Sequence, residues 1–242
     1  MTNTTVSPSP LSPEEKKRIL TRGFIRVILF NTIVGLVFFL SAGTTQWPQV
    51  WILLALWVCY YLYMLTWGLS KSPDMVLERA KGIQKEGKEY EKKVIGVYIL
   101  TFTALIIVSG LDVGRYGWSE VPRLVEVFAF IPVLIAYILP LWAVSSNPFT
   151  AGVMRIQEER GHHVISNGPY HFIRHPMYLG TVIFGIFTPL FIGSWWALIP
   201  GAAMVCVFIV RTALEDRVLQ KELPGYKEYA KKVRYKILPY IW

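Results

Sequence analysis

The chain has 242 residues, of which 53% are hydrophobic and only 17% are charged, with a formal net charge of +9. This composition argues against a soluble domain. The positive charge does not indicate a nucleic-acid-binding protein, because Lys and Arg gather in alternate connections between apolar stretches rather than in one patch. Anionic lipid headgroups are the expected partners of these basic residues.

Six apolar runs are long enough to cross a bilayer, or nearly so. The predicted spans lie near residues 24–43, 47–69, 94–111, 121–142, 176–193 and 194–211. Basic residues precede the first run, lie between the second and third and between the fourth and fifth, and follow the sixth. By the positive-inside rule both termini are then cytoplasmic. We therefore predict an all-α, polytopic membrane helical bundle of about six transmembrane helices.

The chain divides into three predicted parts. Residues 1–23 form a cytoplasmic N-terminal tail, whose first thirteen residues are rich in Ser, Thr and Pro and are expected to be disordered. No small-residue cleavage site follows the first run, so it is interpreted as an uncleaved span. Residues 24–146 hold spans 1 to 4, and residues 147–242 form a C-terminal catalytic region with spans 5 and 6.

Short helices, turns and helix breaks are also predicted in and between the apolar runs. A short helix is expected from Pro73 to Ala80, and residues 112–120 predict a glycine-containing outer turn. Pro132 and Pro140 are expected to kink span 4 or to end it early. Residues 145–170 are too rich in Asn, Gly and Pro for one long helix.

The two cysteines, Cys59 and Cys206, both fall in the middle of a predicted span. Two buried apolar thiols are the simpler interpretation, and a disulfide between them stays open. The redox compartment is not indicated.

The most informative stretch is residues 168–180, GPYHFIRHPMYLG, at the start of predicted span 5. Pro176 suits the first position of a helix, where its missing N–H costs nothing. Arg174 and His175 would then lie beside the free amides of a helix N-terminus, which favour a bound anion. Charged groups so close to hydrocarbon are expensive, and this predicts a functional site.

Spans 5 and 6 form a hairpin, which returns the chain to the level of this motif. Arg211, Glu215 and Asp216 follow the sixth apolar run and are expected to face Arg174, His175 and Tyr178. An isolated arginine at a span end is more often an interfacial anchor. The coincidence of several polar groups at two adjoining helix ends favours a binding site instead. Tyr226 and Tyr229 are interpreted as packing residues.

All four histidines lie close together in the sequence, at positions 162, 163, 171 and 175. His171 and His175 have the spacing that lets two imidazoles on one helix share a metal. Pro169 and Pro176 disfavour a helix through both positions. The sequence therefore predicts no metal site.

The C-terminal part of the chain resembles the isoprenylcysteine carboxyl methyltransferase family and its phospholipid N-methyltransferase relatives. Four features carry the resemblance: the motif of residues 168–180, the Arg-x-x-x-acidic-acidic step from Arg211 to Asp216, the PGYKEY segment and the final RYKILPYIW. The resemblance covers about Asn147 to Trp242. It implies an integral membrane methyltransferase whose cofactor is S-adenosyl-L-methionine and whose active site faces the cytoplasm. The acceptor would be a lipid or a prenylated small molecule from the bilayer.

The resemblance also assigns residues, with the cofactor site in the C-terminal helical hairpin. The implied cofactor-binding residues are Tyr170, Arg174, His175, Pro176, Tyr178, Gly180, Glu215 and Asp216, and the implied catalytic residues are Arg211 and Glu215. Asp216 stands where the family usually has a second Glu, so its contact stays open. Arg211 is the natural group to orient an acceptor carboxylate.

Three alternatives remain open at this point. The acceptor could be a phospholipid or another lipid amine, which would require a base such as Glu215 or His175. A membrane sterol reductase has a similar C-terminal hairpin and would place a nicotinamide cofactor here. A non-enzymatic lipid-binding scaffold would make the motif purely structural. Spans 1 and 2 have no assigned role.

Overall fold

The computed structural model describes residues 12–80, 89–150 and 155–242. These residues form only helices and connections, which confirms the all-α prediction for the described chain. The α-helices are α1 (Pro13–Ala42), α2 (Pro48–Lys71), α3 (Pro73–Ala80), α4 (Glu89–Ser109), α5 (Arg123–Ser146), α6 (Pro176–Phe191), α7 (Leu198–Glu222) and α8 (Tyr226–Lys232). A π-helix η1 (Gly110–Tyr116) continues α4, and two short 3-10 helices, η2 (Glu158–Arg160) and η3 (Gly168–His171), precede α6.

By length and composition, five helical segments of the described chain can cross a membrane: α1, α2, α4 with η1, α5 and α7. Their outer faces carry large exposed apolar side chains, such as Leu40 and Leu124, each 70% exposed. Such faces suit lipid and not water. The predicted fifth span, residues 176–193, is the apolar helix α6, which has 16 residues and is shorter than these five segments. The protein is thus a multi-pass membrane protein.

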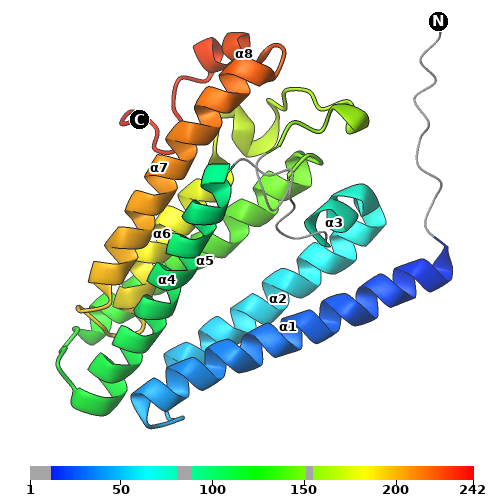
Figure 1. The fold of residues 1–242 in the computed structure, drawn as a ribbon. Helices are drawn as coiled ribbons and strands as arrows, with labels where there is room; N and C mark the ends of the chain where they lie inside the picture. The colour runs from blue at the N-terminus through cyan, green and yellow to red at the C-terminus, as the bar shows by residue number, and fades with distance from the viewer. Residues whose placement is uncertain (1–11, 81–88, 151–154) are drawn as a thin grey trace, which may run out of the picture.

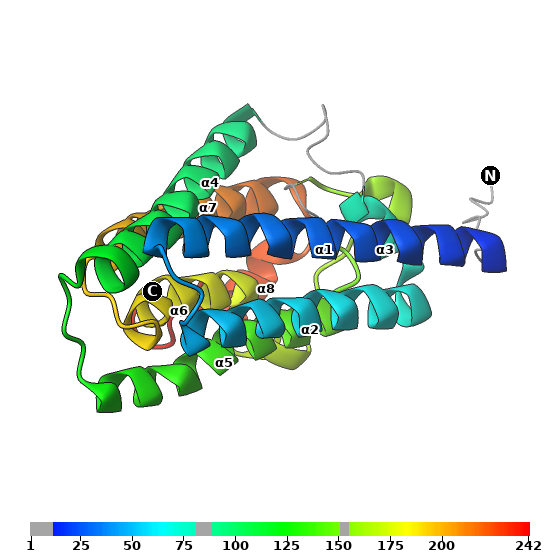
Figure 2. The same cartoon turned by 90° about the horizontal axis from the view of Figure 1, so that it is seen from below.

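Helices α4, α5, α6 and α7 pack into one bundle, with α5 along α6 and both α4 and α6 along α7 (Figure 1). Helices α1 and α2 run side by side as an antiparallel pair, which the view turned by 90° also shows (Figure 2). The start of α1, the short helices α3 and α8 and the C-terminal segment all lie at one end of the molecule (Figure 1). The turns from α1 to α2 and from α6 to α7 lie at the opposite end.

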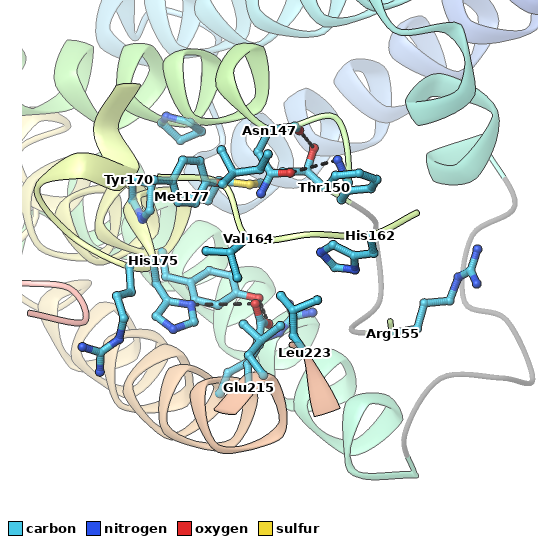
Figure 3. Close-up of a pocket in the computed structure, with 18 of the residues that line it drawn as sticks. Asn147, Thr150, Arg155, His162, Val164, Tyr170, His175, Met177, Glu215 and Leu223 are labelled. Carbon is cyan, nitrogen blue, oxygen red and sulfur yellow. Dashed lines mark hydrogen bonds and ion pairs between the residues drawn. The ribbon is translucent and has the colours of Figure 1, made fainter. Parts of the chain in front are cut away.

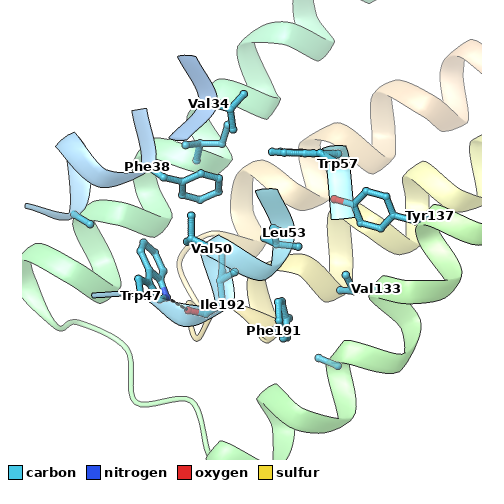
Figure 4. Packing of buried hydrophobic residues seen from close by; sticks show 13 residues of the cluster. Val34, Phe38, Trp47, Val50, Leu53, Trp57, Val133, Tyr137, Phe191 and Ile192 are labelled. Atoms are coloured by element: carbon cyan, nitrogen blue, oxygen red, sulfur yellow. Dashed lines mark hydrogen bonds between the residues drawn. The ribbon is translucent and has the colours of Figure 1, made fainter. Parts of the chain in front are cut away.

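A core of aromatic and aliphatic side chains joins the α1–α2 pair to the bundle near that opposite end (Figure 4). Val50 and Leu53 of α2 are fully buried in it. The indole Nε1 of Trp47 donates a hydrogen bond of 3.3 Å to the carbonyl of Ile192, just after α6. The α1–α2 pair therefore packs against the C-terminal hairpin of α6 and α7.

Several predicted boundaries were wrong. Helix α1 begins at Pro13, within the predicted tail, because Ser12 and Glu15 form a reciprocal capping box; residues 1–11 lie outside the described chain. The first part of the predicted outer turn is wound into η1. Arg115 holds η1 against the end of α1 by donating to the carbonyls of Leu40 and Ser41.

Span 4 does not end early, because α5 continues through Pro132 and Pro140 to Ser146. Helix α7 continues beyond the predicted apolar run, which ends at residue 211, because no Gly or Pro interrupts the chain before Pro224. Cys59 and Cys206 are free and exposed rather than buried. The short helix over Pro73–Ala80 is confirmed.

Candidate functional site

A cavity of about 520 Å³ lies at the end of the bundle that carries α3 and α8 (Figure 3). Its polar wall is built from residues at the start of α6, on α7 and on α8: Arg174, His175, Tyr178, Arg211, Glu215, Tyr226 and Tyr229. Its deeper wall is aromatic and comes from three helices: Tyr60, Tyr61, Tyr98 and Phe208. The cavity therefore has one polar and one largely apolar side.

The beginning of α6 places the motif at the cavity. The helix begins at Pro176 as predicted, with His175 as its N-cap in a non-helical conformation. The C-terminal segment fixes this position, because the amides of Arg174 and His175 donate to the carbonyls of Tyr235 and Lys236 at 3.0 and 2.8 Å. The amide of His175 is thus used within the protein and is not free for an anion.

Arg174 forms a buried ion pair with Asp216 of α7. Its Nε and Nη2 lie 2.7 and 3.1 Å from the two carboxylate oxygens, and its Nη1 donates to the carbonyls of Val233 and Arg234. Arg174 is 7% and Asp216 1% exposed. This pairing commits Arg174 to holding α6, α7 and the C-terminal segment together, instead of leaving its charge for a ligand.

Asp216 is the centre of this network. It also accepts hydrogen bonds from Gln220 and Tyr226, and the His175 Nε2 lies 3.3 Å from its Oδ1. Asp216 does not line the cavity. The Asp216 carboxylate therefore supports Arg174 and His175 from behind the cavity wall.

Glu215, the neighbour of Asp216, does face the cavity. The hydroxyl of Tyr178 donates to Glu215 Oε2, and His175 Nδ1 lies 3.7 Å from Glu215 Oε1. The rings of His175 and Tyr178 are parallel within 4°, with centroids 5.7 Å apart. A carboxylate, an imidazole and a phenol thus meet at the cavity wall, as the hairpin argument predicts.

Arg211 has a partner that the sequence argument missed. Its Nη2 donates to Oε2 of Glu91 on α4 at 2.7 Å, and Glu91 is fully buried. The guanidinium also lies over the rings of Tyr178 and Phe208, at 5.3 and 6.0 Å from their centroids. The signal in the sequence was an acid three residues before the apolar run that begins at Val94.

Gly180 is a packing residue rather than a lining residue. An ideal Cβ at this position would lie 2.6 Å from Pro140 Cγ and 3.0 Å from the carbonyl oxygen of Ala136. Pro140 has no N–H for that carbonyl, and the absence of a side chain at Gly180 lets α6 approach α5 there. Among the other assigned residues, Tyr170 and Pro176 do line the cavity.

The loop before α6 supplies further lining residues that the sequence did not assign to the site, including Thr150, Arg155 and His162 (Figure 3). His162 stacks on Phe149 with centroids 4.6 Å apart, and its Nδ1 accepts a hydrogen bond from the amide of Gln157. Burial lowers the pKa of His162 to about 4, so the ring is neutral at pH 7.

Tyr226 and Tyr229 are buried, as the packing interpretation expects. Each also makes a polar contact, since Tyr226 donates to Asp216 and Tyr229 donates to the carbonyl of Tyr170. Burial raises the pKa of both hydroxyls above the ordinary value, which keeps them protonated donors.

The two histidines with metal-ligand spacing lie in different surroundings. His171 is exposed, whereas His175 is buried at the start of α6. In the described part of the chain, no group of three or more His, Cys, Asp or Glu side chains could hold a metal ion.

Fold and site together define the class: a multi-pass helical membrane protein with a mixed polar and aromatic cavity between its C-terminal hairpin and the remaining helices. Residues 127–221 match the model of the isoprenylcysteine carboxyl methyltransferase (ICMT) family. The match covers less than half of the chain. The matched residues run from α5 to α7 and include both predicted motifs.

A second comparison finds a Delta(14)-sterol reductase from Mus musculus. It is 30% identical to this chain over 108 residues, which are 40% of this chain and 24% of the reductase. The chain thus spans about a quarter of the length of that curated relative.

Proposed function

We propose that this chain is an integral membrane methyltransferase that uses S-adenosyl-L-methionine to methylate a lipid-embedded acceptor. The single observation that carries the proposal is the cavity over α6 and α7, which joins the polar residues of the ICMT-matched segment to an aromatic wall. A reaction between a water-soluble methyl donor and an apolar acceptor needs such a two-sided site.

The residues fit this cofactor. A cavity of about 520 Å³ lies within the range of about 300–1,000 Å³ usual for small-molecule sites. Glu215 offers a carboxylate for an amine or for ribose hydroxyls, and the face of Tyr178 suits a sulfonium. Arg211 Nε is buried and has no hydrogen-bond partner among the described residues, as expected of a donor kept for a ligand.

The balance of charge argues against the nicotinamide cofactor of a sterol reductase. Of the four arginines that line the cavity, three are paired with carboxylates: Arg174 with Asp216, Arg211 with Glu91, and Arg155 with both Glu78 and Glu159. These pairs leave little positive charge for several phosphate groups. A zwitterionic cofactor is easier to accommodate.

When bound, S-adenosyl-L-methionine supplies an electrophilic methyl group on a positively charged sulfur. The chain's own contribution is to hold donor and acceptor in line and to exclude water. Tyr178 and His175 orient Glu215 toward the cavity. Glu91 and the two aromatic rings orient Arg211, which is placed to position an acceptor.

The acceptor most like that of the family is a prenylcysteine carboxylate. A carboxylate is already a nucleophile and needs no base, so Arg211 would act by orientation alone. The aromatic wall of Tyr60, Tyr61 and Tyr98 would receive the apolar chain of such an acceptor. A lipid amine would need a proton acceptor, and Glu215 is the group within reach. The active site faces the cytoplasm in this proposal, in line with the basic connections at the same end.

The proposal is tested by calorimetric titration of the detergent-purified protein with S-adenosylhomocysteine and, separately, with NADPH. We expect the homocysteine compound to bind and NADPH not to bind. Binding of NADPH alone would favour the sterol reductase alternative that the Mus musculus relative suggests. Binding of neither would favour a lipid-binding scaffold.

A further inference from the structure

Arg79 is the fourth arginine that lines the cavity, and it comes from α3, outside the segment that matches the family. Its Nε donates to the carbonyl of Thr150 at 3.3 Å, and its Nη2 lies 4.0 Å from the sulfur of Met177. These are a long hydrogen bond to a neutral group and a weak contact with a thioether. The side chain is half-buried. Most of its hydrogen-bonding capacity is therefore unused.

The other three lining arginines each have a carboxylate within 2.7 Å. Arg79 makes no ion pair with any residue of the described ranges 12–80, 89–150 and 155–242. A half-buried guanidinium without an anion is unfavourable unless an anion arrives. The contrast marks Arg79 as the lining arginine whose charge is not matched by a carboxylate of the described chain.

The neighbourhood of Arg79 is polar and lies on the cavity wall. Asn147, Thr150 and Tyr170 line the cavity beside it. Burial raises the pKa of Tyr170 above its ordinary value, and the charge of Arg79 opposes this shift. The charge of Arg79 thus influences Tyr170, which belongs to the family motif, although Arg79 lies in another part of the chain.

We propose that Arg79 binds the carboxylate of a bound reactant. Its planar fork of N–H donors matches a carboxylate, which accepts two parallel hydrogen bonds. The carboxylate is either that of the amino-acid part of the cofactor or that of the acceptor. The inference rests on the proposed methyltransferase function and adds a residue that the matched segment does not contain.

The experiment compares Arg79→Gln, Arg79→Lys and the wild type. Lys71→Gln is the matched control, because Lys71 is an exposed cation at the end of α2 that does not line the cavity. Thermal unfolding in detergent establishes that each variant is folded. Calorimetry then measures affinity for S-adenosylhomocysteine and for methylthioadenosine, which lacks the amino-acid carboxylate. A third titration uses S-farnesylthiopropionate, an apolar carboxylate, with the homocysteine compound saturating.

If the cofactor supplies the carboxylate, Arg79→Gln weakens S-adenosylhomocysteine about 10- to 100-fold and leaves methylthioadenosine unchanged. If the acceptor supplies the carboxylate, Arg79→Gln weakens the binding of S-farnesylthiopropionate by the same factor and leaves the affinity for S-adenosylhomocysteine unchanged. Arg79→Lys keeps the charge without the fork and shows a smaller loss. Unchanged affinity for both carboxylates in folded Arg79→Gln would overturn the assignment. Wild-type protein that does not bind S-adenosylhomocysteine would instead refute the proposed function, so the two failures are distinguishable.

Discussion

At the scale of single residues, the neighbouring acids Glu215 and Asp216 of α7 have different roles. Asp216 is turned into the protein, where it neutralises Arg174, whereas Glu215 is turned into the cavity, where Tyr178 and His175 hold it. Successive positions on a helix point in different directions, so one step along the chain separates structural support from ligand contact. The sequence alone assigns both acids to the same site.

This division predicts different consequences for two substitutions. Arg174→Ala leaves Asp216 buried without its counter-ion, which should cost about 3–5 kcal/mol of the free energy of unfolding. Glu215→Gln keeps an acceptor for Tyr178 and should leave the unfolding temperature near that of the wild type, while binding of S-adenosylhomocysteine is lost. Thermal unfolding and calorimetry in detergent measure both. Equal unfolding temperatures for the two variants would contradict the assignment.

His162 predicts a pH dependence in the loop that lines the cavity. Its pKa of about 4 in the folded protein lies below the ordinary 6.5, so the unfolded chain takes up the proton first as the pH falls. The stabilisation that depends on neutral His162 is complete above pH 6.5 and is lost as the pH falls toward 4. A protonated Nδ1 can no longer accept from the amide of Gln157.

The measurement compares unfolding temperatures of the wild type and His162→Phe between pH 7.5 and pH 4.5. Phe keeps an aromatic ring against Phe149 and does not titrate. We expect the wild type to lose stability relative to the variant across this interval. A constant difference would mean that His162 is not the titrating group.

At the scale of helices, the position of the site depends on how closely α6 approaches α5. Gly180 faces Pro140 and the carbonyl that the proline leaves without an amide donor. The contact sits one turn from the start of α6, where Pro176 and His175 meet the cavity. The spacing of α5 and α6 therefore determines where the motif lies.

Gly180→Val should force α6 away from α5, because even its Cβ would lie 2.6 Å from Pro140 Cγ. We expect a loss of about 1–3 kcal/mol in the free energy of unfolding, with weaker binding of S-adenosylhomocysteine. Gly96→Ala on α4 is the control, since a Cβ there meets nothing within 4 Å. Thermal unfolding should show the control to be neutral or slightly stabilised. A fully stable Gly180→Val would rule out the close approach.

At the scale of the whole molecule, segments from distant parts of the chain together form the cavity. The α1–α2 pair is fastened to the C-terminal hairpin at the far end by Trp47 and Ile192. At the near end, α3 follows α2 and brings Arg79 to the cavity wall. The C-terminal segment returns to pair with Arg174 and His175. Segments outside the family match thus complete a site whose central residues lie inside it.

The sequence by itself determined the all-α membrane class, the short helix at Pro73–Ala80, the start of α6 at Pro176 and the convergence of the motif with Glu215. Hydropathy, proline geometry and the return of a hairpin are local rules, so they can be read from residues near in the chain. Only the tertiary structure decided that Arg174 forms an ion pair with Asp216, that Arg211 forms one with Glu91, and that Gly180 allows α6 to pack closely on α5. Pairing and burial depend on residues tens of positions apart, and a single sequence does not say which of them meet.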